Sequence, residues 1–175
     1  MKHARKLASL LLALVMVFAL ATTAFAQDVT LTNGEGSITI SNAAKGETYT
    51  IYKLFDATVS ADHTSIAYTG TVPADLADYF TADGNGYISA TEAAKDGENM
   101  SEGLKTALTA WTAKATSTAT AKSDGTALTF KGLAYGYYVV TTTQGKQVIS
   151  VDSTMPNAKI VDKNSSTPSD LKKTA

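Results

Sequence analysis

The chain has 175 residues, of which 44% are hydrophobic and 18% are charged, with three prolines, so it can bury the core of one ordinary domain and is not disordered throughout. It contains no cysteine and two histidines, which excludes thiol nucleophiles, thiolate metal sites and disulfide bonds and leaves little for histidine-based catalysis. Its 15 basic residues are balanced by 16 acidic ones and form no basic patch beyond the N-terminus, so nucleic acid is not an expected partner.

The N-terminal segment 1–26 has the three parts of an export signal. Residues 1–6 are basic, residues 7–20 form an apolar run, and Ala24-Phe25-Ala26 matches the small-x-small motif of signal peptidase. A retained membrane anchor is the alternative, but the apolar run is shorter than the ~20 residues that span a bilayer. We therefore expect a secreted mature protein that begins at Gln27 and holds no membrane segment. The removed segment takes three basic residues with it, which leaves 12 basic against 16 acidic residues, a net charge of about −4.

Threonine and other β-branched residues alternate with polar ones near both ends of the mature chain, which favours β-strands. Turns that contain glycine or proline separate most of these segments. The segments that fit a strand are 37–41, 48–55, 65–69, 127–130, 135–143, 147–151 and 158–162. Short strands in this number predict a mainly β fold with the architecture of a β-sandwich.

Between the third and fourth of these segments the hydrophobic period changes from two to about 3.6 residues, which predicts a helical insertion. A short helix is expected to begin at Pro73. A second helix is expected over 100–115, with Asn99 and Glu102 as its N-terminal capping pair. Its apolar stripe consists of Leu104, Leu108, Trp111 and Ala115. We interpret the stripe as packing against the sandwich, and the alternative is a partner groove or ligand face.

The C-terminal part of the sequence changes character after Asn164. Residues 165–175 are polar and contain Pro168, which is typical of a linker. We therefore expect a signal peptide, one domain over 27–164, and a linker that leads into a further domain.

Residues 81–92 resemble a calcium-binding EF-hand loop. Asp83, Asn85 and Glu92 occupy ligand positions of that loop. The first ligand position holds Thr81, which brings no negative charge and weakens calcium binding. The alternative is an ordinary turn followed by a capping box, because Asp-Gly-Asn-Gly is good turn chemistry. No other metal site and no cofactor is expected.

Lys53 shares one face of its strand with three large apolar side chains. By alternation these are Tyr49, Ile51 and Phe55. An amine in such surroundings needs a partner, so Lys53 is expected to extend towards solvent or to pair with a carboxylate.

On the last predicted strand, neighbouring residues point to opposite faces. Ile160, Asp162 and Asn164 fall on one face, and Lys159, Val161 and Lys163 fall on the other. If Asn164 faces the core, Lys163 faces solvent.

Three blocks, in this order and spacing, carry a resemblance to a known family. They are 49–57 (YTIYKLFDA), 132–140 (GLAYGYYVV) and 156–164 (PNAKIVDKN). With these blocks the chain resembles the N-terminal domain of the sortase-assembled pilins and related isopeptide-forming fimbrial surface proteins of Gram-positive bacteria. The resemblance covers nearly the whole mature chain. It implies an immunoglobulin-like sandwich with a helical insertion, exported and then joined by a sortase into a covalent fibre of the cell wall.

The resemblance also implies a sortase acceptor, a lysine at the end of the domain whose amine attacks the acyl-enzyme formed between sortase and the next subunit. Lys163 takes this place, and Lys159 is the alternative. The family has an aromatic-proline pair before the lysine, where this chain has Val161 and Asp162, and a tryptophan upstream, where it has Thr154. A further alternative is an ordinary solvated lysine on an edge strand.

Members of the family form internal bonds between a lysine and an asparagine, for which Lys53 and Asn164 are the candidates. The reaction needs a neutral amine beside a protonated carboxylic acid in an apolar pocket. The strand that usually carries this acid, 135–143 here, has no Asp or Glu, and Val139 stands about where one is expected.

The resemblance implies a structural subunit of a shaft-type pilin, with other pilin subunits and a sortase as its partners. The alternative is an adhesin domain that binds a host protein or glycan, with Tyr87, Tyr135 and Tyr137 as candidate contacts. An enzyme is least favoured, because the sequence holds no recognisable catalytic constellation. Since the chain ends without a sorting signal, we expect an N-terminal fragment of a longer pilin rather than a short subunit that can only accept.

Overall fold

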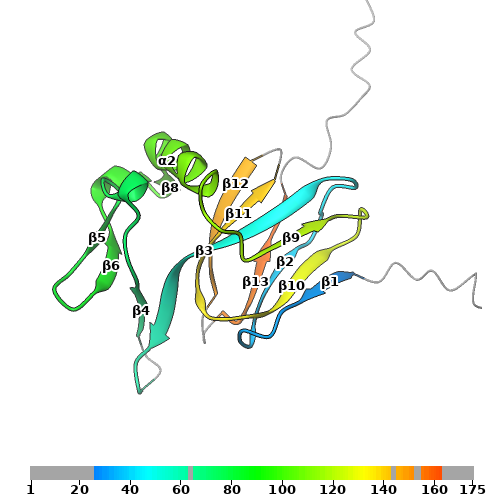
Figure 1. Ribbon diagram of the computed structural model, residues 1–175, viewed down its shortest axis with the longest axis horizontal. Helices are drawn as coiled ribbons and strands as arrows, with labels where there is room; N and C mark the ends of the chain where they lie inside the picture. Colours follow the sequence, from blue (N-terminus) through cyan, green and yellow to red (C-terminus); the bar gives the residue numbers. More distant parts are fainter. Residues whose placement is uncertain (1–25, 63–64, 143–144, 152–154, 163–175) are drawn as a thin grey trace, which may run out of the picture.

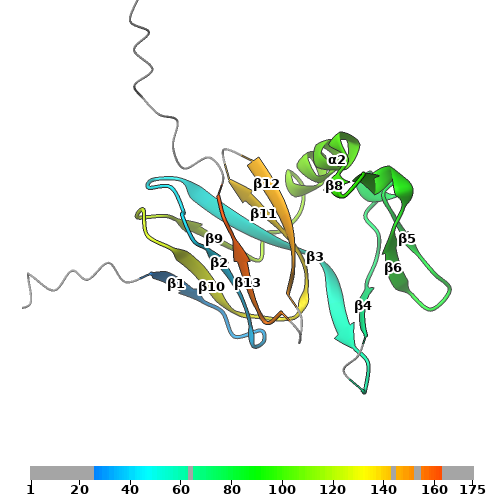
Figure 2. The ribbon, with the colours of Figure 1, turned by 180° about the vertical axis from the view of Figure 1, so that it is seen from behind.

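The computed structural model describes residues 26–62, 65–142, 145–151 and 155–162. The mainly β fold expected from the sequence is confirmed, since these residues form three β-sheets and one α-helix. Within these ranges, no helix is long and apolar enough to cross a membrane. Figures 1 and 2 show two layered sheets with a helical region to one side of them.

The first sheet has four strands in the order β1-β10-β2-β13. They are β1 (Gln27–Thr30), β10 (Leu128–Leu133), β2 (Gly36–Ile40) and β13 (Asn157–Ile160). β2 pairs antiparallel with β10 and parallel with β13, while β1 pairs parallel with β10. Segments from the beginning and the end of the described chain therefore lie in one sheet (Figure 2).

The second sheet has the strand order β12-β11-β3-β4-β6-β5, and β9 also pairs with β3. Its strands are β3 (Thr48–Val59), β4 (Ile66–Thr69), β5 (Phe80–Ala82), β6 (Tyr87–Ala90), β9 (Ala119–Lys122), β11 (Gly136–Thr142) and β12 (Gly145–Val151). β3 is central: β11 lines one of its edges, and β9 and then β4 line the other. Figure 1 shows β3 running out of the layered sheets towards β4.

The two sheets share a buried core, called the first core below. Its largest members are Ile38, Ile40, Tyr49, Ile51, Phe130 and Tyr138. They come from β2 and β10 on one side and from β3 and β11 on the other. The alternation that predicts these strands from the sequence is the same alternation that sends every second side chain into this core.

A second core covers the opposite face of the seven-stranded sheet. Here α2 (Glu102–Thr112) and the 3-10 helix η1 (Ala74–Leu76) pack against β3 and β11. The buried members include Leu76, Phe80, Leu104, Leu108 and Val139. Leu104 and Leu108 belong to the apolar stripe predicted for the second helix, so the interpretation of that stripe as packing is confirmed for these two residues.

The helix α2 begins later than the sequence predicts. Its N-cap is Ser101, whose Oγ accepts a hydrogen bond from Leu104 N at 3.2 Å. Asn99 is not the cap, because it belongs to the short strand β8 (Asn99–Met100), which pairs with β7 (Lys95–Asp96). Strand pairing of its backbone therefore takes precedence over its favourable capping chemistry.

Two short 3-10 helices flank the hairpin of β5 and β6, η1 before it and η2 (Glu92–Ala94) after it. The helix expected from Pro73 is thus only one turn long, because Phe80 already begins β5. The sequence does not predict β1, β5, β6, β7, β8 or β9. Each has four residues or fewer, so few alternating positions mark it, whereas the equally short β4 and β13 lie in longer alternating segments.

A β-bulge at Leu54 changes the faces of β3. Tyr138 on β11 pairs with Lys53, and the preceding Tyr137 pairs with Phe55, so Leu54 is an extra residue in the ladder. Leu54 and Phe55 both enter the second core. The prediction that Phe55 shares a face with Lys53 is therefore wrong, because strict alternation ends at the bulge.

We expect Ser101→Ala to lower the free energy of unfolding by about 1 kcal/mol, because it removes the N-cap of α2. Ser101 Oγ also donates to Ala93 O at 2.6 Å, so the variant loses a second hydrogen bond. Asn99→Ala is the matched control and should cost less than about 0.5 kcal/mol, as exposed substitutions usually do. Urea unfolding of both variants measures the difference, and a larger loss for Asn99→Ala would contradict the assignment.

Candidate functional site

β13 and the two residues after it alternate between buried and exposed. Ala158, Ile160 and Asp162 are buried, and Lys159 and Val161 are exposed. The predicted faces are confirmed for these residues. The candidates that follow, Lys163 and Asn164, lie outside the described residues, so the structure describes the segment that carries them up to residue 162.

Asp162 is a buried carboxylate, with 5% of the residue exposed, and hydrogen bonds from two segments hold it. The Asn42 side chain accepts from Asp162 N at 2.5 Å and donates to Asp162 O. Tyr49 Oη donates to Asp162 Oδ2 at 2.6 Å and accepts from Ala44 N at 2.8 Å. These bonds offset the desolvation that a carboxylate suffers when it leaves water.

Tyr49 holds this hydrogen-bond network in a fixed position. Burial and the hydrogen bond to the Asp162 carboxylate raise the pKa of Tyr49 to about 12. The hydroxyl therefore stays protonated at neutral pH and keeps its role as a donor. Because Tyr49 is 1% exposed and belongs to the first core, its ring is fixed by the packing of both sheets.

The aliphatic part of the Lys53 side chain lies over Gly136 of β11 in the seven-stranded sheet. A Cβ added to Gly136 would lie 2.6 Å from Lys53 Cε, so the glycine leaves the space that the aliphatic stem fills. The amine forms an ion pair with Asp56, whose side chain is 65% exposed. Of the outcomes expected for this lysine, the structure shows pairing with a carboxylate. Residues three apart on a regular strand face opposite ways, and the bulge at Leu54 is what lets these two meet.

The position where a catalytic acid is expected does not adjoin Lys53. Val139 is buried in the second core, so an acid there would face away from Ile51 and the first core. The carboxylate next to the lysine, Asp56, is largely solvated instead of lying in an apolar pocket. The proposed bonding partner, Asn164, lies outside the described residues.

A β-hairpin separates the calcium-loop candidates. Asp83 Oδ1 accepts from Asn85 N at 2.8 Å and from Tyr87 N at 2.9 Å, which closes the turn between β5 and β6. Glu92 begins η2 beyond the far end of β6, and its side chain is 97% exposed. At a rise of about 3.3 Å per residue, Tyr87 and Glu92 are on the order of 15 Å apart. The structure thus forms the turn without assembling the ligands, and within the described ranges no cluster of three His, Cys, Asp or Glu residues could hold a metal.

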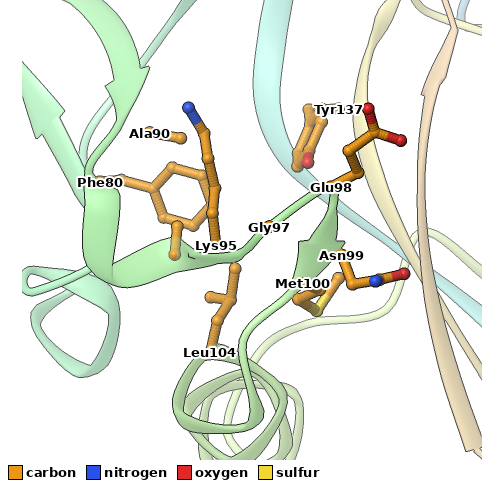
Figure 3. Close-up of a pocket in the computed structure, with 10 residues that line it drawn as sticks. Phe80, Ala90, Lys95, Gly97, Glu98, Asn99, Met100, Leu104 and Tyr137 are labelled. Atoms are coloured by element: carbon orange, nitrogen blue, oxygen red, sulfur yellow. The ribbon is translucent and has the colours of Figure 1, made fainter.

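An apolar cleft of about 350 Å³ opens between the helical region and the sheet (Figure 3). The residues that line it include Phe80, Met100, Leu104 and Tyr137, together with the charged Lys95 and Glu98. A smaller hollow of about 140 Å³ adjoins it and extends along further aromatic side chains. In that hollow the rings of Tyr137 and Tyr68 meet edge to face, with centroids 5.3 Å apart. The cleft has the mixture of apolar walls and a few polar groups that is typical of binding sites.

The three tyrosines considered as adhesin contacts do not form one surface. Tyr137 lines the cleft, Tyr135 packs against the first core, and Tyr87 is 47% exposed on β6. The walls of the cleft come from β5, β6, η2, β7, β8, α2 and β11 together. No local sequence pattern could have indicated a site assembled from seven separate elements.

The chain was compared with protein-family models and with curated protein sequences, and it matches none of them. The function of the chain is therefore inferred from its own residues and from the three blocks 49–57, 132–140 and 156–164.

We expect the mature protein to keep the full mass of its sequence, without the ammonia that a Lys53–Asn164 bond would release. The Lys53 amine pairs with the largely solvated Asp56 carboxylate, whereas bond formation requires a protonated acid beside the amine in an apolar pocket. Intact-mass spectrometry of the exported protein measures this. Since cyclisation of an N-terminal glutamine at Gln27 releases the same molecule, peptide mapping must accompany it. A cross-linked peptide that disappears in Lys53→Ala would contradict the prediction.

Proposed function

We propose that residues 27–164 are the N-terminal, immunoglobulin-like domain of a shaft-type pilin. In this proposal the exported protein is a structural subunit of a covalent fimbrium on a Gram-positive cell wall, and a sortase joins the subunits through Lys163. Two features of the fold support it: two sheets enclose one core, and the helical insertion lies between strands of one of them. The export signal and the three sequence blocks support it independently.

One observation carries the proposal, the anchoring of Asp162 directly before Lys163. A lysine that joins subunits must present its amine to an enzyme while its backbone stays attached to a folded body. The residue before Lys163 is buried and hydrogen-bonded to Asn42 and Tyr49, so the chain is fixed to the domain up to the proposed acceptor.

Lys159 is the alternative acceptor and differs from Lys163 in its surroundings. It lies within β13, where its backbone pairs with Thr39 of β2. Its side chain is exposed, so an enzyme can reach the amine, but the residues before and after Lys159 are also paired in the first sheet. An enzyme that draws the lysine into a cleft must also accommodate that sheet, which favours Lys163.

Lys163→Ala is expected to abolish the polymer ladder that boiling-resistant, covalently joined subunits give on a denaturing gel of the cell-wall fraction. Lys159→Ala is the matched control and should leave the ladder unchanged. A ladder that persists in Lys163→Ala and collapses in Lys159→Ala would move the acceptor to Lys159. A single monomer band from the wild type would overturn the pilin assignment.

The second candidate function is a surface adhesin domain that binds a host protein or glycan, and the cleft in Figure 3 is the observation that favours it. Binding of the exported protein to glycan arrays or host proteins tests it. If the cleft is the binding site, Glu98→Lys should weaken binding by about tenfold, because it reverses a charge beside the apolar lining. Glu35→Lys, on the loop between β1 and β2, is the control and should have no effect. Equal affinities for all three proteins would exclude the cleft.

A further inference from the structure

Asn42 continues the first sheet after its strands have ended. The last backbone hydrogen bond between the β2 side and the β13 side joins Ser41 N to Ile160 O at 3.0 Å. Beyond it, the Asn42 side chain replaces a strand: its Oδ1 accepts from Asp162 N at 2.5 Å, and its Nδ2 donates to Asp162 O. One side chain thus satisfies both backbone groups of Asp162, as a pairing strand would.

Tyr49 holds the same residue from the other sheet. It is the second residue of β3, and its hydroxyl donates to the Asp162 carboxylate at 2.6 Å while Ala44 N donates to that hydroxyl at 2.8 Å. Asp162 is therefore fixed through its backbone by the segment after β2 and through its side chain by β3. We call Asn42, Tyr49 and Asp162 the Asp162 clamp.

We propose that Asn42 and Tyr49 are positioning residues for the sortase acceptor, because through Asp162 they fix the backbone one residue before Lys163. The inference rests on the proposed function and adds to it the residues that determine how well the amine is presented.

The joining reaction makes the position of this backbone important. The neutral amine of Lys163 attacks the acyl carbon of the acyl-enzyme, an amide bond forms, the bond to the enzyme's nucleophile breaks, and the proton lost by the amine passes to that leaving nucleophile. The attacking atom must approach within about 3–3.5 Å of the acyl carbon in the right direction. The rate therefore scales with the fraction of molecules in which the lysine is correctly presented.

The clamp acts where the strand itself offers little support. β13 has four residues and pairs with β2 alone among the described strands, and a short strand paired along one edge opens more readily than a central one. The clamp ties the segment down two residues beyond the strand.

The test compares Tyr49→Phe and Asn42→Ala with Tyr138→Phe in the full chain, expressed in the cells that export it. Tyr138 is the matched control, because it is also 1% exposed in the first core and its hydroxyl donates to a backbone carbonyl, Ala134 O, at 2.7 Å. The readouts are the covalent ladder of the cell-wall fraction and the melting temperature of each exported protein. Cells are grown well below all of these melting temperatures, so that every variant is folded.

We expect each clamp variant to reduce the ladder by about tenfold, the factor that corresponds to one buried hydrogen bond, while Tyr138→Phe leaves the ladder unchanged. A purely structural role predicts that Tyr49→Phe and Tyr138→Phe lower the melting temperature and the ladder in parallel, and this result would overturn the inference. A normal ladder in both clamp variants would overturn it as well and leave the proposed function intact. If the wild type gives no ladder, or if the ladder survives Lys163→Ala, the proposed acceptor is wrong and the inference falls with it.

Discussion

The burial of β3 on both faces is the constraint on which the rest of the structure depends. One face places Tyr49 and Ile51 in the first core, and the other places Leu54 and Phe55 in the second. Both edges of the strand are paired as well, with β11 on one side and with β9 and β4 on the other. The seven-stranded sheet therefore continues from the first core into the helical region, and β3 is the strand that both parts share. A chain without cysteine gains from this arrangement, since no disulfide is available to tie the two regions together.

The bulge in β3 connects the two cores. A regular strand would send Phe55 towards the first core, beside Lys53. The extra residue, Leu54, turns Phe55 to the second core, where its ring meets Phe80 edge to face with centroids 5.1 Å apart. The same bulge brings Lys53 and Asp56 to one side. A single inserted residue thus supplies an aromatic contact for the helical region and a partner for an otherwise unpaired amine.

The sequence predicts the parts of this structure that depend on local periodicity. Alternation identifies β2 and β3 and assigns the faces of Lys159, Val161 and Asp162 correctly, because every second residue is buried along these segments, in β3 as far as the bulge. Features that depend on pairing between distant segments are missed. The bulge is visible only in the register with β11, and the hydrogen bonds of Asn42 and Tyr49 to Asp162 join residues more than a hundred positions apart. The cap of α2 is misassigned for a local reason: the two-residue strands β7 and β8 are too short to be recognised in the sequence, and their pairing decides the role of Asn99.

The buried carboxylate of Asp162 is not explained by stability alone. A well-packed apolar side chain of similar volume would avoid the desolvation of a charge and would often stabilise a fold at least as well. The Asp162 carboxylate instead needs the Tyr49 hydroxyl, and the Asn42 side chain needs the backbone of Asp162. These requirements specify one position for the chain, because a shift along β2 would break the hydrogen bonds. Apolar contacts at this place would tolerate such a shift. The polar network therefore fixes the position of Asp162, which matters under the proposed function because the next residue, Lys163, has to meet a sortase.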